Sequence, residues 1–308
     1  MPRLLTLLLT LALTGCAAGS GAPQRTIPLE DIPLASILSG PAPADPFLAT
    51  VAEVLRGMSA PASVAVRDEA ARSGLTLAVD PALPNQVLAS TSNPDNRIAL
   101  RDLGALYFVD RELRSVLRRL LEEELRHASD LRFLVSLPPA PANQEAYDLV
   151  GRMMVEANAR VAVALAFAQE RALDPDADFY LEPALCSRAL LSALGSGDAA
   201  ARREAARSIA LDFLRDDGPY YIAFENDRMG GDGASRAVRD AAFVARVHSE
   251  AARLFTLPGD TVPYLGEADF VRAVTRLGEG DGPSAASASF AFSSLFPTAG
   301  ADYHPCAY

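Results

Sequence analysis

The residues of this chain best suited to joint chemistry are concentrated in the segment 110–136. There, Glu123-Glu124-Leu125-Arg126-His127 brings two carboxylates and an imidazole within five positions. On a helical wheel, Glu124 and His127 fall on the apolar face, and Glu123 falls at its edge. A buried carboxylate must be paired, hydrogen-bonded or bound to metal, or its pKa shifts until it is neutral. The pattern therefore indicates either a functional site or a buried polar network that only joins helices.

The helix that must carry these groups is amphipathic by the same count. Its apolar face is formed by Leu113, Val116, Leu117, Leu120, Leu131 and Leu134. The opposite face is formed by Arg114, Arg118, Ser129 and Arg132. We therefore expect the acid–imidazole group to point inward and the arginines to lie in solvent.

A second helix, predicted over 142–173, offers a further carboxylate. Its apolar face is formed by Ala146, Leu149, Val150, Met153, Ala157, Ala164, Leu165 and Ala168. Glu156 lies at the border of this face, and Arg160 lies within it. If the two helices pack antiparallel as neighbours, Glu156 can approach Glu123 and His127.

The rest of the chain is rich in helix and poor in strand. Short strands are expected at 75–79 and 96–101. Further helices are expected at 46–58, 62–73, 182–195, 198–215, 236–256 and 266–277. The predicted fold class is therefore α+β and mostly helical, with a small N-terminal sheet and two core helices that carry the site.

The segment from Glu123 to Ala128 resembles the His-Glu-Leu-Arg-His-Ala motif of a bacterial family described as metallopeptidases, whose function is otherwise unknown. In that family two short strands precede the helix, and Glu-Ala-Asp-Ala follows on the next helix. Here the second motif is Glu156-Ala157-Asn158-Ala159, and Pro263-Tyr264-Leu265 also fits. The resemblance covers roughly residues 60–270 and implies a zincin-like fold of the gluzincin type.

Carried over to these positions, the resemblance implies that His127 and Glu156 are metal ligands and that Glu124 is the general base. Glu123 takes the place of the first histidine. Zinc, the implied cofactor, accepts carboxylate oxygen as a ligand. An additional anion makes the bound water less acidic and favours harder metals such as manganese, so Glu123 weakens the zinc prediction.

The other histidines offer few alternatives. His304 could supply a ligand only if the C-terminal tail folds back, and His248 is the other histidine outside the motif. Di-iron carboxylate bundles use two Glu-x-x-His motifs, of which this chain has one, at Glu124 and His127. Three tyrosines could stabilise an oxyanion, and the sequence does not choose among Tyr220, Tyr221 and Tyr264.

The N-terminus has the features of a lipoprotein signal peptide. Arg3 is followed by the apolar run 4–13, which is too short to span a bilayer. Leu13-Thr14-Gly15-Cys16 resembles the bacterial lipobox, which implies cleavage after residue 15 and lipidation of Cys16. By the same resemblance, Ala17 rather than Asp after the cysteine implies the outer membrane, facing the periplasm. We therefore predict a signal peptide at 1–15, a lipidated tether at 16–45 and one zincin-like domain at 46–308.

Charge and cysteine content restrict the partners. The formal charge is −11, and loss of Arg3 makes it −12, which disfavours binding to nucleic acid. The chain contains no lysine, so Schiff-base chemistry and a P-loop are excluded. In an oxidising compartment Cys186 and Cys306 are candidates for a disulfide, and two unpaired cysteines are the alternative.

Two functional hypotheses follow. The first is a membrane-anchored metallopeptidase that hydrolyses a peptide or protein substrate with metal-activated water, or a degenerate, metal-free descendant of one. The second is a catalytically inactive zincin-fold lipoprotein that binds an envelope protein partner or helps to assemble the envelope.

Overall fold

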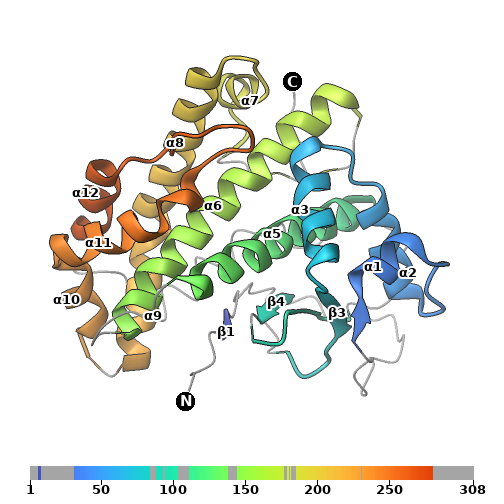
Figure 1. Ribbon diagram of the computed structural model, residues 1–308, viewed down its shortest axis with the longest axis horizontal. Helices are drawn as coiled ribbons and strands as arrows, with labels where there is room; N and C mark the ends of the chain where they lie inside the picture. The colour runs from blue at the N-terminus through green and yellow to red at the C-terminus, as the bar shows by residue number, and fades with distance from the viewer. Residues whose placement is uncertain are drawn as a thin grey trace. The chain divides into compact units, whose positions relative to one another are not determined.

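The protein is described by a computed structural model that is mostly helical (Figure 1). The structure describes residues 6–7, 31–83, 88–92, 94–102, 111–137, 144–176, 179, 181, 185–229 and 231–279. The two longest helices are α5 (Arg111–Ser136) and α6 (Gln144–Leu173). Among the described residues, no helix is both long enough and apolar enough to cross a membrane.

The chain divides into two compact units where one domain over 46–308 was predicted. Unit 1 comprises Met1–Ser129, Leu165–Cys186 and Phe292–Tyr308, and unit 2 comprises Asp130–Ala164 and Ser187–Ala291. The division falls within α5 and within α6. Each unit is therefore built on parts of both long helices.

Unit 1 contains a small mixed sheet in the order β1-β4-β5-β3-β2. Its strands are β1 (Thr6–Leu7), β2 (Ile32–Pro33), β3 (Thr76–Val79), β4 (Ala89–Ser92) and β5 (Arg97–Leu100). β3 and β5 are parallel, and the other pairs are antiparallel. β1 lies within the predicted signal peptide, so four strands remain without that segment.

The two predicted strands are confirmed as β3 and β5, whereas β4 was missed. Its sequence, Ala-Ser-Thr-Ser, lacks the apolar alternation on which the strand prediction depends. A turn at 94–96 precedes β5, and its Asn96 has a φ of 47°. Asparagine tolerates this left-handed conformation better than most residues do.

The helices α1 (Leu34–Ser39), α2 (Pro46–Arg56) and α3 (Pro61–Arg72) complete the N-terminal part of unit 1. Asp45 caps α2 by accepting a hydrogen bond from the backbone N–H of Leu48 at 3.0 Å. The segment 16–45, predicted as a tether, includes β2 and α1. β2 and α1 are ordered there, because Leu34 and Ile37 bury their side chains in the core of unit 1.

That core also corrects the wheel prediction for α5. Leu121, Leu125 and Ala128 are buried in addition to Val116, Leu117 and Leu120 of the predicted apolar face, so α5 buries a wider surface than the wheel predicted. Arg118, expected in solvent, is buried. Its Nη2 lies 3.0 Å from Glu170 Oε2, and its guanidinium lies over the ring of Phe179. Arg118 therefore forms a buried ion pair, whereas the helical wheel predicted that it would be exposed to solvent.

Unit 2 is helical and contains the later elements of the chain. They are α7 (Arg188–Leu194), α8 (Ala199–Asp216), α9 (Gly218–Met229), α10 (Gly233–Arg239), α11 (Ala241–Ala251), the 3₁₀ turn η2 (Ala252–Phe255) and α12 (Glu267–Leu277). α9 was missed, and the helix predicted at 236–256 is divided. Asp240 is extended and caps α11 by accepting from the N–H of Phe243, which ends α10 one residue earlier.

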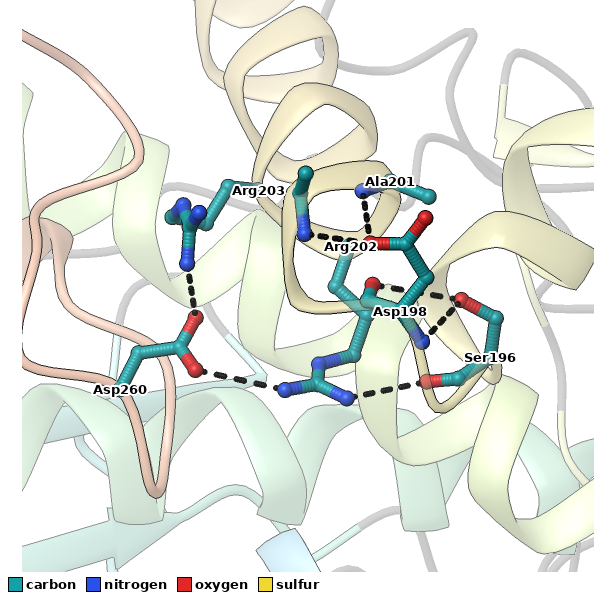
Figure 2. Close-up of polar contacts among 7 residues, drawn as sticks. Ser196, Asp198, Ala201, Arg202, Arg203 and Asp260 are labelled. Carbon is teal, nitrogen blue, oxygen red and sulfur yellow. Dashed lines mark hydrogen bonds and ion pairs between the residues drawn. The ribbon is translucent and has the colours of Figure 1, made fainter.

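An ion pair fixes the segment between η2 and α12. Figure 2 shows the buried Asp260 carboxylate between the guanidinium groups of Arg202 and Arg203, at 3.3 and 3.5 Å. The same view shows Asp198 capping α8, with Oδ1 accepting from the N–H of Ala201. Asp260 therefore anchors the segment that carries Tyr264 to the first turn of α8.

Candidate metal centre

The candidate site is carried by α5 and α6, which are close to the predicted helices 110–136 and 142–173. Both are far longer than the helix of about 11 residues that is average in globular proteins. The expected inward orientation holds for the site residues. Glu124 and His127 are fully buried, and Glu123 and Glu156 keep only 8% and 5% of their surface exposed.

The three predicted metal ligands come together. Glu123, His127 and Glu156 each offer one potential ligand atom, and these atoms all lie within 4.8 Å of one another. Three points at such spacing all lie less than about 3 Å from a common point, close to the 2.0–2.2 Å of zinc bonds to nitrogen and oxygen. No other such group occurs among the residues that the structure describes.

His127 is in the protonation state that a metal ligand requires. Burial lowers its pKa to about 3, and the positive charges of Arg126 and Arg119 lower it further. The imidazole is therefore neutral at physiological pH and has a lone pair to offer.

Glu124 lies against the sheet and is held by Thr91 of β4. The Thr91 Oγ1 atom lies 2.5 Å from Glu124 Oε2 and 3.2 Å from the Glu124 carbonyl oxygen. Because one hydroxyl donates only one proton, a protonated Glu124 can donate to Thr91 while Thr91 donates to that carbonyl. Glu124 Oε1 has no hydrogen-bond partner among the described residues.

The pKa of Glu124 fits a carboxyl that can take up a proton near neutral pH. Burial raises this pKa to about 8, the Thr91 hydrogen bond opposes the rise, and the charge of Glu123 adds to it. A group of this kind is suited to general acid–base work, in which the best pKa lies close to the operating pH.

Glu123, in the place of the first histidine of the motif, has an arginine one helical turn before it. Arg119 Nη2 lies 3.3 Å from Glu123 Oε2, and both side chains are largely buried. The sequence reading gave Arg119 no role, because a wheel assigns a face to a residue but not a partner.

Within unit 2, a buried polar chain joins the end of α5, α6 and the segment before α12. Asn158 Nδ2 donates to Asp130 Oδ2 at 2.6 Å, and Tyr264 Oη donates to Asn158 Oδ1 at 2.9 Å. Of the three tyrosines considered for an oxyanion, Tyr264 is thus bound to a side chain of its own unit. Tyr221 instead packs against the ring of Phe213.

The other predicted residues that the structure describes contribute nothing to this cluster. His248 Nε2 lies 3.0 Å from the carbonyl oxygen of Leu265, and its ring packs against Phe255 and Phe270. Cys186 is disulfide-bonded. Cys16, Cys306 and His304 lie outside the described residues, so the lipidation of Cys16 and the Cys186–Cys306 pairing stay predictions.

Comparison with family models, with curated proteins and with solved structures finds no match to this chain. The family resemblance consequently depends on the motifs given above. The geometry of the site has to be judged by its own chemistry.

Proposed function

We propose that this protein is a metal-dependent peptide hydrolase whose metal is held by Glu123, His127 and Glu156. The proximity of their ligand atoms, within 4.8 Å of one another, carries the proposal. A neutral imidazole and two buried carboxylates are ligands that zinc and manganese accept. Zinc supplies a Lewis acid that polarises the scissile carbonyl and makes a water molecule more acidic.

Glu124 has the position and the proton affinity to act as the general base. It lies next to Glu123 and one turn before His127, so it shares their surroundings. In the reaction, its carboxylate takes a proton from the attacking water and passes that proton to the leaving amine. Thr91, which donates to the carboxylate form of Glu124, limits the rise of the Glu124 pKa.

Replacing Glu124 by Gln tests this role directly. We expect Glu124→Gln to bind zinc as the wild type does and to lose at least about a hundredfold in the rate of peptide hydrolysis, as expected for a lost general base. Glu122→Gln is the matched control, because Glu122 is a buried glutamate two residues earlier on the same helix and is not one of the proposed ligands. Equal rates in wild type and Glu124→Gln would remove the enzymatic proposal.

Burial of the site favours a second candidate function. A catalytic metal needs an open coordination position that substrate can reach. Here Glu124 and His127 are 0% exposed. The second candidate is a zincin-derived lipoprotein without catalysis that binds a protein of the cell envelope. It is favoured if the protein binds zinc but hydrolyses no substrate in a broad peptide library.

We further propose that the protein is anchored to the outer membrane by lipid on Cys16 and faces the periplasm, because Leu13-Thr14-Gly15-Cys16 resembles a lipobox. Mass spectrometry of the mature N-terminal peptide distinguishes lipidation of Cys16 from simple cleavage of a signal peptide. We expect an acylated Cys16 in the wild type. An N-terminus at any other residue contradicts the anchor.

A further inference from the structure

Arg119 is placed where it can control the charge of the candidate metal centre. It precedes Glu123 by one turn of α5, and its Nη2 lies 3.3 Å from Glu123 Oε2. The two side chains are only 9% and 11% exposed, so water screens their interaction poorly.

The guanidinium and a metal ion would interact with the same carboxylate. Arginine keeps its positive charge in proteins, so Arg119 competes with a metal ion for the Glu123 carboxylate at every physiological pH. A divalent cation on Glu123 and His127 must share Glu123 with Arg119 and must accept a fixed positive charge nearby. Both effects weaken cation binding, and they weaken it most in a buried site.

The pair also balances the unusual residue at position 123. A zincin motif has a neutral histidine there, whereas Glu123 adds a negative charge. The neighbouring Arg119 cancels that charge within one helical turn. The Glu123–Arg119 pair thus has the same net charge as the single imidazole that it replaces.

We propose that Arg119 determines how tightly this centre binds divalent cations, by holding Glu123 in an ion pair and by opposing a second positive charge. This inference depends on the metal centre proposed above. It assigns to Arg119 a positioning role, because the guanidinium acts through Glu123 and not on the substrate.

Titration of the purified protein with Zn²⁺ alone, followed by calorimetry, tests the role of Arg119. We expect Arg119→Leu to bind Zn²⁺ at least about tenfold more tightly than the wild type, because a nearby like charge has been removed. Arg119→Lys keeps the charge and should stay within about threefold of the wild type. Arg114→Leu is the matched control: this arginine is on the same helix and pairs with the exposed Glu53. Its affinity should not change.

A second variant pair covers the case in which Arg119→Leu does not fold. In Glu123→His the motif has its first histidine, but Arg119 keeps its positive charge beside it. We therefore expect Glu123→His to bind Zn²⁺ at least about tenfold more weakly than Glu123→His/Arg119→Leu. Equal affinities in this pair would overturn the role of Arg119.

The outcomes separate the two proposals. Tight binding by Arg119→Leu with weak or absent binding by the wild type supports the role of Arg119. Wild-type binding that Arg119→Leu leaves equal or weakens overturns the role of Arg119 and leaves the metal centre intact. Folded wild-type and Arg119→Leu proteins that both fail to bind Zn²⁺ overturn both proposals.

Discussion

The hydroxyl of Thr91 opposes the rise that burial causes in the pKa of Glu124, although no motif contains this threonine. It comes from a four-residue strand and reaches both the carboxylate and the carbonyl oxygen of Glu124. A hydrogen bond to the charged form of a carboxylate stabilises that form. The reactivity of Glu124 therefore depends on the sheet as well as on its own helix.

Replacing Thr91 by Val removes this donor and nearly preserves the shape of the side chain. We expect the pKa of Glu124 to rise further above its already raised value of about 8, because the hydrogen bond lowers it. Carbon-13 NMR of the glutamate carboxyl groups measures the change. Thr50→Val, in which a buried α2 hydroxyl that donates to the Pro46 carbonyl is lost, is the control. A Glu124 pKa that is unchanged or lower in Thr91→Val contradicts this view.

The site was predictable to the extent that it obeys helical periodicity. The spacing of Glu124 and His127 within an apolar arc was sufficient to predict their burial, and Glu156 followed from the second helix. Thr91 and Arg119 were not predictable in the same way. Thr91 belongs to a strand without an apolar pattern, and the partner of Arg119 depends on rotamers and packing.

At the scale of the elements, α5 is held within unit 1 by a buried ion pair. Arg118 of α5 meets Glu170 of α6 at 3.0 Å. Glu170 also accepts from the hydroxyl of Ser59 and from the backbone N–H of Ala60, at the start of α3. One carboxylate thus joins both long helices to the N-terminal part of the same unit.

Replacing Arg118 by Met leaves the charge of Glu170 buried without its cation. We expect the free energy of unfolding to fall by about 3 kcal/mol, the lower end for a broken buried pair, since two hydrogen bonds to Glu170 remain. Urea unfolding measures the change. The exposed Arg72→Met on α3 is the control and should stay within about 0.5 kcal/mol of the wild type. A loss in Arg118→Met as small as that in the control would show that the pair does not hold α5.

The prediction of elements succeeded where local signals were strong. The predicted helices 46–58, 110–136 and 142–173 match α2, α5 and α6 to within two residues at each end. The prediction of elements failed where a tertiary contact determines whether a segment is ordered. α1 lies in a segment whose Ala, Pro and Ser content is typical of a tether, and only the burial of Leu34 and Ile37 orders it.

At the scale of the whole molecule, the buried titratable groups give the metal-free protein a stability optimum below neutral pH. Burial lowers the pKa of His127 and of His248 from 6.5. Below pH 6.5 these two histidines are protonated in the unfolded chain but stay neutral in the folded chain. The free energy of unfolding therefore falls as the pH drops below 6.5. Burial raises the pKa of Glu122 to about 7 and that of Glu124 to about 8. For these groups stability falls as the pH rises from 4.5 toward 8.

The two trends oppose each other between pH 4.5 and 6.5, the ordinary pKa values of the two residue types. We therefore expect the stability of the metal-free protein to be greatest in that range. Urea unfolding at a series of pH values measures it. Glu124→Gln should flatten the decline between pH 6.5 and 8, because the group that must lose its proton is gone. Maximal stability at pH 8 in the metal-free wild type would contradict the burial of these carboxyl groups.

The most direct test of the metal centre is X-ray absorption at the zinc edge on protein loaded with excess Zn²⁺ and then desalted. We expect one zinc ion per chain with nitrogen and oxygen ligands at about 2.0–2.2 Å, including a single imidazole. His127→Ala and Glu156→Gln should retain far less zinc than the wild type. A wild-type protein that retains no zinc, or variants that retain as much as the wild type, would contradict a metal centre at Glu123, His127 and Glu156.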